Sequence, residues 1–379
     1  MYLSELKVLT ILFLYFTFYQ TSISNSIHFF AAALLQAISW IAIAIIPEIS
    51  IATLTIFLLL SNLGASIAEV ANDAIVAEAG KLTRGSSAAN LQSFGWMSGS
   101  SAGVLGNLLG GFVINRLSPT TIFLFFGLIL VLQFFITVSV PESSLNLPKI
   151  PSNSSKSSSI QKQLSEISLA LRKPEISRSI AWFSASYAMV PALTGTMFFY
   201  QTQHLNLDSS VIGLSKVFGQ AAILVWSFAY NKWFKITPAR KLLSALQVTM
   251  AVFALSDVLF VKGIYRGMGV PDSVYVVIFS GLLEVLFIFK LLPFSVFLAR
   301  VCPAGCEGSV MAFLTSAMAL STIVSGYLGV AVAALVGVSG GDFSGLAIGL
   351  VIQAVCTALP LCWISWVPLG DERTEKKEE

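Results

Sequence analysis

Long apolar stretches separated by short polar connections dominate the pattern of this chain. A helix needs about 20 mostly apolar residues to cross the roughly 30 Å hydrocarbon core of a bilayer. Stretches of that kind lie at residues 27–46, 51–79, 90–115, 119–140, 178–201, 210–231, 241–262, 273–300, 307–336 and 344–367. The pattern therefore predicts an all-α polytopic membrane protein.

A further apolar stretch at residues 8–19 is shorter than the others. The polar residues 21–26 that follow it offer no convincing small-residue cleavage site for a signal peptidase. We therefore expect an uncleaved interfacial or partial membrane helix, which brings the total to about 10–11 membrane helices.

One long polar interruption, residues 141–175, divides the chain. Residues 141–159 are rich in serine and proline, a composition that does not fold alone. Residues 160–171 place four apolar side chains on one helical face, as in a helix at a membrane surface. The predicted parts are a helical bundle at 1–140, a linker at 141–177, a six-helix bundle at 178–367 and a charged tail at 368–379.

Basic residues predict the orientation, because lysine and arginine resist translocation. If the linker is cytoplasmic, sixteen of the 22 basic residues share its side: Lys81, Arg84, Lys149, Lys156, Lys162, Arg172, Lys173, Arg178, Lys232, Lys235, Arg240, Lys241, Arg300, Arg373, Lys376 and Lys377. Arg116, Lys262 and Arg266 fall on the opposite side. Two helical groups joined by a cytoplasmic linker, with the C-terminus on the same side, are the plan of a two-half secondary transporter.

Composition excludes several other classes. The chain is 56% hydrophobic and 11% charged, with a mean hydropathy of +0.83, whereas a soluble domain carries about 25% charged residues. The net charge of +3 and the lack of a long basic run argue against nucleic acid as a partner. Cys302, Cys306, Cys356 and Cys362 lack the spacing of a zinc site. Without a nucleotide loop or a nucleophile–base pattern, we expect neither an enzyme nor a cofactor.

The second long stretch carries the strongest polar signal. Asn62, Ser66, Glu69 and Asp73 are spaced so that they form one stripe on a helix. Buried ionisable residues in a bilayer are costly and mark functional sites by default. The Glu69 and Asp73 carboxyl groups could exchange a proton or accept hydrogen bonds from a ligand. Alternatively, they pair with a basic residue and lock two helices together.

The next stretch combines small residues with two larger candidates. Its glycines recur at intervals typical of closely packed membrane helices: Gly95, Gly99, Gly103, Gly106 and Gly110. Gln92 and Trp96 share a face and could supply a hydrogen bond and a stacking plane to a solute.

The second half contains Lys216, Asp257, Glu284 and Lys290 within its apolar stretches. Lys216 is close enough to a helix start to reach the interface by snorkelling. Lys290 is deeper and could attract a carboxylate-bearing solute. Glu284 and Lys290 are six positions apart, on different faces of a regular helix, and are not expected to pair.

Three segments resemble the folate–biopterin transporter family, a branch of the major facilitator superfamily. Residues 68–78 (AEVANDAIVAE) resemble the family's acidic fourth-helix motif, and residues 299–308 (ARVCPAGCEG) are similar to its connection between helices ten and eleven. Residues 230–235 (YNKWFK) and 240–243 (RKLL) are similar to its eighth-to-ninth connection.

The resemblance implies a twelve-helix fold of two six-helix halves, in which the long stretches of this chain are helices three to twelve. It also implies a folate or pterin solute, carried by alternating access and coupled to protons. A carboxylate would bind ring N–H groups, an aromatic side chain would stack, and a lysine would bind the anionic glutamyl tail. The plant members of the family make the plastid envelope a plausible location.

The chain departs from the family pattern near its start. The first helix, the second helix and the basic loop before the third are missing or altered, and residues 21–26 with His28 stand where that loop is expected. Two alternatives therefore remain open: a carrier of another organic anion, and a shortened membrane protein that does not transport.

Overall fold

The computed structural model describes the backbone of residues 26–82, 87–114, 116–139, 168–302, 307–338 and 341–369. Side chains are described at these positions except at 26–30, 70–82, 87–89, 111, 112, 114, 136–138, 209 and 307–309. The chain divides into two compact units. The first holds α2 to α5 and the first residues of α14, and the second holds α7 to α13, the rest of α14 and α15.

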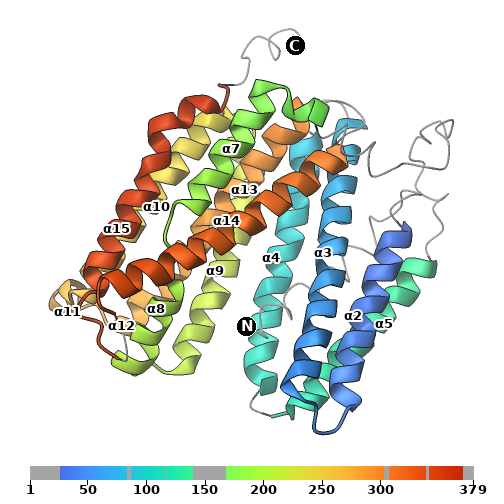
Figure 1. The fold of residues 1–379 in the computed structure, drawn as a ribbon, viewed down its shortest axis with the longest axis horizontal. Coiled ribbons are helices and arrows are strands. Elements are labelled where there is room, and N and C mark those ends of the chain that lie inside the picture. The colour runs from blue at the N-terminus through green and yellow to red at the C-terminus, as the bar shows by residue number, and fades with distance from the viewer. Residues whose placement is uncertain are drawn as a thin grey trace. The chain divides into compact units, whose positions relative to one another are not determined.

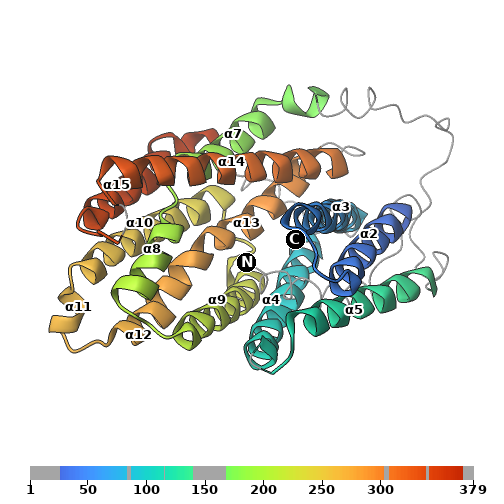
Figure 2. The ribbon, with the colours of Figure 1, turned by 60° about the horizontal axis from the view of Figure 1, so that its bottom comes forward.

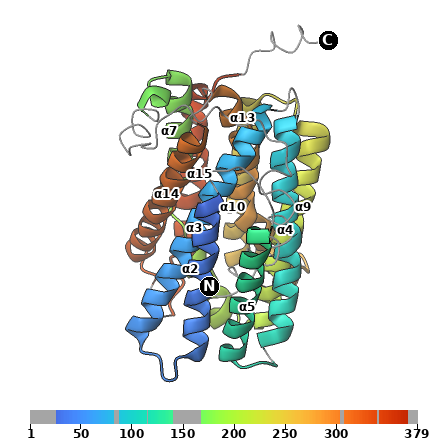
Figure 3. The same cartoon turned by 90° about the vertical axis from the view of Figure 1, so that its right-hand side faces the viewer.

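The first unit consists of long helices joined by short turns (Figures 1 and 3). Its elements are α2 (Ser26–Ile45), α3 (Ile51–Leu82), α4 (Ser87–Ile114) and α5 (Pro119–Ser139), and α14 (Glu307–Leu335) begins there. Serine residues begin two of these helices: the Ser50 hydroxyl accepts from Thr53 N at 3.1 Å, and the Ser118 hydroxyl accepts from Thr121 N at 3.2 Å. Such caps satisfy backbone donors that a helix start leaves free.

Helix α2 packs against both α3 and α5 in this unit. A Cβ added at Gly64 would lie 2.8 Å from the Ala32 carbonyl oxygen, so α3 approaches α2 backbone to backbone. Trp40 on α2 adds to this packing. The centroid of its ring lies 5.5 Å from that of Phe123 and 5.7 Å from that of Phe126, both on α5. Small residues therefore set the closest helix approach in this unit, as expected for helices in lipid.

The second unit contains more helices, and several of them are short or interrupted (Figure 2). Its elements are α7 (Pro174–Ala188), α8 (Thr194–Phe199), η2 (Tyr200–His204), α9 (Ser209–Ala229), η3 (Tyr230–Phe234), α10 (Ala239–Val261), α11 (Ile264–Gly267), α12 (Asp272–Tyr275), η4 (Val276–Ser280), α13 (Gly281–Val301), most of α14, α15 (Leu346–Ala358) and η5 (Leu359–Trp366). Helix α13 lies between α9 and α10, and α10 also packs against α15.

The stretch at 178–201 differs from the continuous helix that its apolarity predicts. Helix α7 ends at Ala188, and α8 begins at Thr194. Pro191 lies in the gap and has no N–H to continue a helix. Helix α14 satisfies the freed groups: the Ser325 hydroxyl donates to Val190 O at 2.5 Å, and Ala192 N donates to Ser325 O at 3.0 Å. The break is thus compensated by a neighbouring helix.

In the described part of the chain, six helices are long and apolar enough to cross a membrane: Ile51–Glu69, Ser210–Phe234, Ala239–Val261, Asp272–Val301, Val310–Leu335 and Leu346–Trp366. Shorter apolar helices lie at Ala31–Ile45 and Pro119–Phe135. Helix α4 is 28 residues long but rich in glycine and serine. The predicted all-α membrane architecture is confirmed, while the total of about 10–11 crossings stays a prediction.

Several predicted features lie outside the described residues. They are the short helix at 8–19, the Ser/Pro-rich part of the linker, most of the amphipathic helix at 160–171, and the charged tail beyond 369. The fourfold division of the chain at 140, 177 and 367 also stays a prediction.

Candidate functional site

The polar stripe predicted on the second long stretch lies on α3. Asn62, Ser66 and Glu69 are all exposed on this helix, and α3 continues without interruption to Leu82. The side chain of Asp73 lies outside the described residues. The structure therefore places the first three members of the stripe on an exposed helix face, and the pairing of Glu69 with Asp73 stays a prediction.

Gln92 and Trp96 lie half-buried on α4. The glycine stripe of α4 divides into two parts: Gly103, Gly106 and Gly110 are buried, but a Cβ added at Gly99 would meet nothing within 4 Å. Gly99 therefore leaves open space one turn from Trp96 and makes no close helix contact there.

Lys216 and Glu284 form an ion pair that joins α9 to α13. Each side chain is 40% exposed, and the two residues are 68 positions apart. Close backbone packing supports the pair, because a Cβ on Gly281 would lie 2.7 Å from the Ser215 carbonyl oxygen. Lys216 therefore has a carboxylate partner within the protein.

Lys290 is fully buried in the second unit. Its Nζ donates to Gln247 Oε1 on α10 at 2.8 Å and to Ser186 Oγ on α7 at 3.1 Å. The same nitrogen lies 4.2 Å from the Tyr187 ring centroid and 6.0 Å from that of Phe183. We call these five side chains the Lys290 nest. As expected, Lys290 does not pair with Glu284.

Within the Lys290 nest, the amine contacts neutral oxygen atoms and aromatic rings. Among the described residues, no carboxylate contacts the Lys290 amine. Gln247 is held in place because its Nε2 donates to Thr357 O at 2.6 Å. Burying an amine without an opposite charge is expensive, so such an arrangement is typical of a site for an anion.

Sequence reasoning did not single out Ser186, Tyr187 or Gln247. A signal for Gln247 was present, since an amide in the middle of an apolar stretch must find a hydrogen-bonding partner. Ser186 and Tyr187 carried no such signal, because serine and tyrosine are common in membrane helices. Their role becomes visible only when α7, α10 and α13 are folded together.

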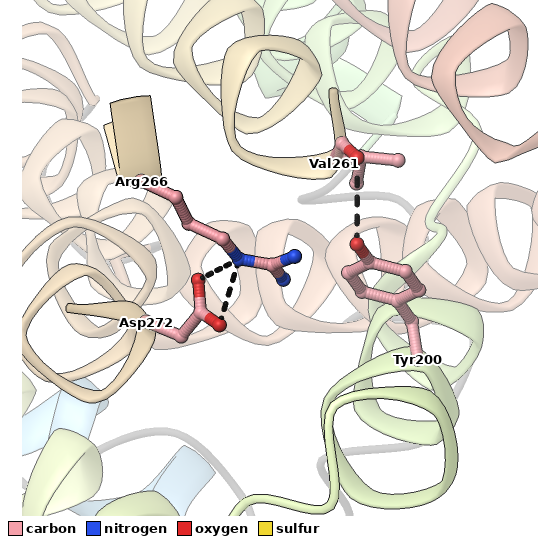
Figure 4. Close-up of polar contacts among 4 residues, drawn as sticks. All are labelled: Tyr200, Val261, Arg266 and Asp272. Carbon is pink, nitrogen blue, oxygen red and sulfur yellow. Dashed lines mark hydrogen bonds and ion pairs between the residues drawn. The ribbon is translucent and has the colours of Figure 1, made fainter. Parts of the chain in front are cut away.

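A second polar cluster ties η2 and the end of α10 to the elements that follow α10 (Figure 4). Arg266 Nε donates to both oxygens of Asp272, at 2.7 and 2.9 Å, and its guanidinium end points toward Tyr200. Tyr200 donates to Val261 O at 3.4 Å. The hydrogen bond to Asp272 raises the pKa of Arg266 above its ordinary value. These contacts fix the turn that leads from α10 into α12 and α13.

The described residues contain no group of three or more His, Cys, Asp or Glu side chains that could hold a metal ion. The chemistry that the geometry offers is therefore charge and hydrogen bonding, from an exposed carboxylate on α3, a paired lysine on α9 and a buried amine on α13.

The fold places the chain in a known structural class. Its superposition on the human organic anion transporter MFSD10 covers 97% of this chain and 81% of that protein, with a TM-score of 0.62 and 15% sequence identity. It likewise covers 84% of the proton:xylose symporter XylE, with a TM-score of 0.60 and 13% identity. The chain has the fold of the major facilitator superfamily, as the sequence predicted.

Sequence comparison identifies the family. Residues 13–379 match the model of the BT1 family. "Probable folate-biopterin transporter 7" of Arabidopsis thaliana is 55% identical over 369 residues, which are 94% of this chain and 83% of the relative. "Probable folate-biopterin transporter 8, chloroplastic" of the same plant is 44% identical. That alignment covers 90% of this chain and 63% of the relative. The chain belongs to the BT1 family, and the expected membership in a family of transporters, not enzymes, is confirmed.

Proposed function

We propose that the chain carries folates or pterins across a membrane by alternating access. The single observation that carries this proposal is the Lys290 nest, a fully buried amine whose partners among the described residues are all neutral. The relatives whose names specify a folate–biopterin solute support the choice of ligand.

The chemistry of these solutes fits the nest. Folates carry carboxylates on their glutamyl tail, and a carboxylate binds an ammonium group through charge-assisted hydrogen bonds. The Tyr187 and Phe183 rings beside Lys290 offer flat apolar faces for the aromatic part of a ligand. A solute carboxylate that reached Lys290 during the transport cycle would supply the missing opposite charge.

The α3 stripe is proposed as a second point of contact, independent of the first. Glu69 and Asp73 would accept hydrogen bonds from pterin N–H groups or exchange the coupled proton, and Asn62 would extend the same face. Gln92 and Trp96 on α4 would add a hydrogen bond and a stacking plane. Lys216 and Glu284, being paired, would contribute by breaking and re-forming their ion pair as the helices move.

The location is also a proposal. Two relatives carry "chloroplastic" in their names, which supports the plastid envelope. The distribution of basic residues supports placing the linker and the C-terminus on the cytoplasmic or stromal side.

Uptake of radiolabelled folate by proteoliposomes that contain the full chain tests the proposal. We expect saturable uptake that unlabelled folate and pterin both inhibit, that a pH gradient stimulates, and that an unrelated organic anion leaves unchanged. Protein-free liposomes are the control. Asp73→Asn should abolish the stimulation by the pH gradient.

Three results would contradict parts of the proposal. Equal inhibition by an unrelated organic anion would favour a carrier of another solute. Folded protein without flux would favour a membrane protein that does not transport. An unchanged pH dependence in Asp73→Asn would remove the proposed role of the α3 carboxylates.

A further inference from the structure

Asp257 is a second buried ionisable residue of the second unit, and the proposed transport does not use it. It lies near the C-terminal end of α10, which ends at Val261, and is 6% exposed. Its Oδ1 lies 3.0 Å from the hydroxyl oxygen of Tyr275, which is fully buried. In the described part of the chain no cation pairs with Asp257. A buried carboxyl without a cation is far more stable as a neutral acid.

The hydrogen bonds around Asp257 form a short chain. The Tyr275 oxygen lies 2.7 Å from Ser256 Oγ, and Ser256 Oγ donates to the Phe253 carbonyl oxygen at 2.8 Å. Three contacts thus connect Asp257, Tyr275, Ser256 and the backbone of α10. The positions of the heavy atoms alone do not assign the hydrogens of such a chain.

Counting the hydrogens distinguishes the two protonation states. If Asp257 is ionised, the hydroxyls of Tyr275 and Ser256 supply two hydrogens for three contacts, and one contact lacks a hydrogen. If Asp257 is protonated, its own hydrogen completes the set. Asp257 then donates to Tyr275, Tyr275 donates to Ser256, and Ser256 donates to the Phe253 carbonyl. The observed geometry therefore satisfies every contact only with a protonated carboxyl.

Aromatic packing covers the Tyr275 end of this chain, whereas Ser256 at the other end is partly exposed. The Tyr275 ring stacks on Phe260 at 4.2 Å and on Phe279 at 5.1 Å, and Tyr265 lies 4.8 Å away. The Asp257 carboxyl is therefore shielded on its Tyr275 side as long as α12 and η4 stay packed on α10, and separation of these elements would expose it to water.

Other titratable groups lie on the elements that pack near α10. They are Cys356, Cys362, Glu284, Lys290, Arg300, Tyr265, Arg266, Asp272, Tyr200 and His204. Glu284 pairs with Lys216, and Arg266 pairs with Asp272. Lys290 bonds to Gln247, ten residues before Asp257, which is about 15 Å along a helix.

We propose that Asp257 is a proton-binding site and that this conformation holds the proton. When α12 and η4 move away, the carboxyl O–H bond breaks, the proton passes to water, and a carboxylate remains. The site goes beyond the proposed function, because it binds a proton whichever solute the protein carries.

Infrared spectroscopy of the purified full chain in lipid tests this site. At pH 7, well above the ordinary aspartate pKa of about 3.9, the wild-type protein should show the C=O stretch of a protonated carboxylic acid. Asp257→Asn should lose that band. Tyr275→Phe should keep the carboxyl but shift the band to higher frequency, because one hydrogen bond to the acid is lost.

Asp208→Asn is the matched control. The Asp208 carboxylate is exposed and accepts from Ser210 N at 2.7 Å, which lowers its pKa below the ordinary value. It is therefore ionised at pH 7, and its replacement should leave the acid band unchanged. Identical spectra of the wild type and Asp257→Asn at pH 7 would overturn the proposal. If Asp257→Asn does not fold, an unshifted band in folded Tyr275→Phe would overturn it equally.

Discussion

Two lysines in neighbouring helices of the second unit have opposite surroundings. Lys216 on α9 is half-exposed and paired with the Glu284 carboxylate. Lys290 on α13 is fully buried and bonded to a serine, an amide and an aromatic face. Lys216 already has a carboxylate partner within the protein, whereas the described partners of Lys290 are all neutral. The same residue type therefore joins two helices in one place and is suited to bind an anion in the other.

Lys290→Met should have the largest effect on transport. Methionine keeps most of the side-chain volume, so the cost to folding should be limited to the lost hydrogen bonds, chiefly about 1–3 kcal/mol for the buried Gln247 Oε1. Loss of a charged hydrogen bond of about 1.5–3 kcal/mol should reduce folate uptake by roughly tenfold to a hundredfold. Uptake assays and thermal unfolding of the same preparation measure both quantities.

Lys262→Met, which removes an exposed lysine just beyond α10, is the control for this experiment. It should change neither uptake nor unfolding. If Lys290→Met kept full uptake, or if both variants lost uptake equally, Lys290 would not differ from any other lysine in the way proposed.

Gly281→Ala should destabilise the region around Lys216 more than loss of the ion pair does. The added Cβ would lie 2.7 Å from the Ser215 carbonyl oxygen, a backbone atom that cannot move without shifting α9. Overpacking of this kind costs about 1–3 kcal/mol. Thermal unfolding should show the loss, and Gly326→Ala, where nothing lies within 4 Å of an added Cβ, should not. Equal midpoints for the two variants would mean that close packing does not position this pair.

The smallest effect is expected from the ion pair itself. Because both side chains are 40% exposed, solvent screening should limit their coupling to less than about 1 kcal/mol. Unfolding of Lys216→Met, Glu284→Gln and the double variant gives this coupling directly as the non-additive part. A coupling above about 2 kcal/mol would show that Lys216 is as shielded as a buried residue, and the contrast with Lys290 would disappear.

Most of the helices could be predicted from the sequence. Apolar stretches long enough to cross a bilayer predicted α9, α10 and the continuous run from α12 to α13 within a few residues of their observed bounds. The physical reason is that polar backbone groups in lipid must form their hydrogen bonds within the helix. The break at 189–193 was not predicted. Pro191 signals a local interruption, but only the Ser325 contacts from α14 allow the helix to stop there.

The candidate site, like the helices, was predictable from the sequence only in part. Spacing along one helix predicted the α3 stripe and the separation of Glu284 from Lys290, because both depend on helical geometry alone. The pairing of Lys216 with Glu284 and the contact of Lys290 with Gln247 join residues 68 and 43 positions apart. No local pattern encodes such distances.

The sequence by itself determined that this chain is a helical membrane protein of a transporter family, because apolar length and local motifs are properties of single segments. The tertiary structure decided which charged side chains are paired, which are buried and which remain uncompensated. Those properties depend on the neighbouring helices, since a lysine or an aspartate in lipid is stable only with the partners that folding brings to it.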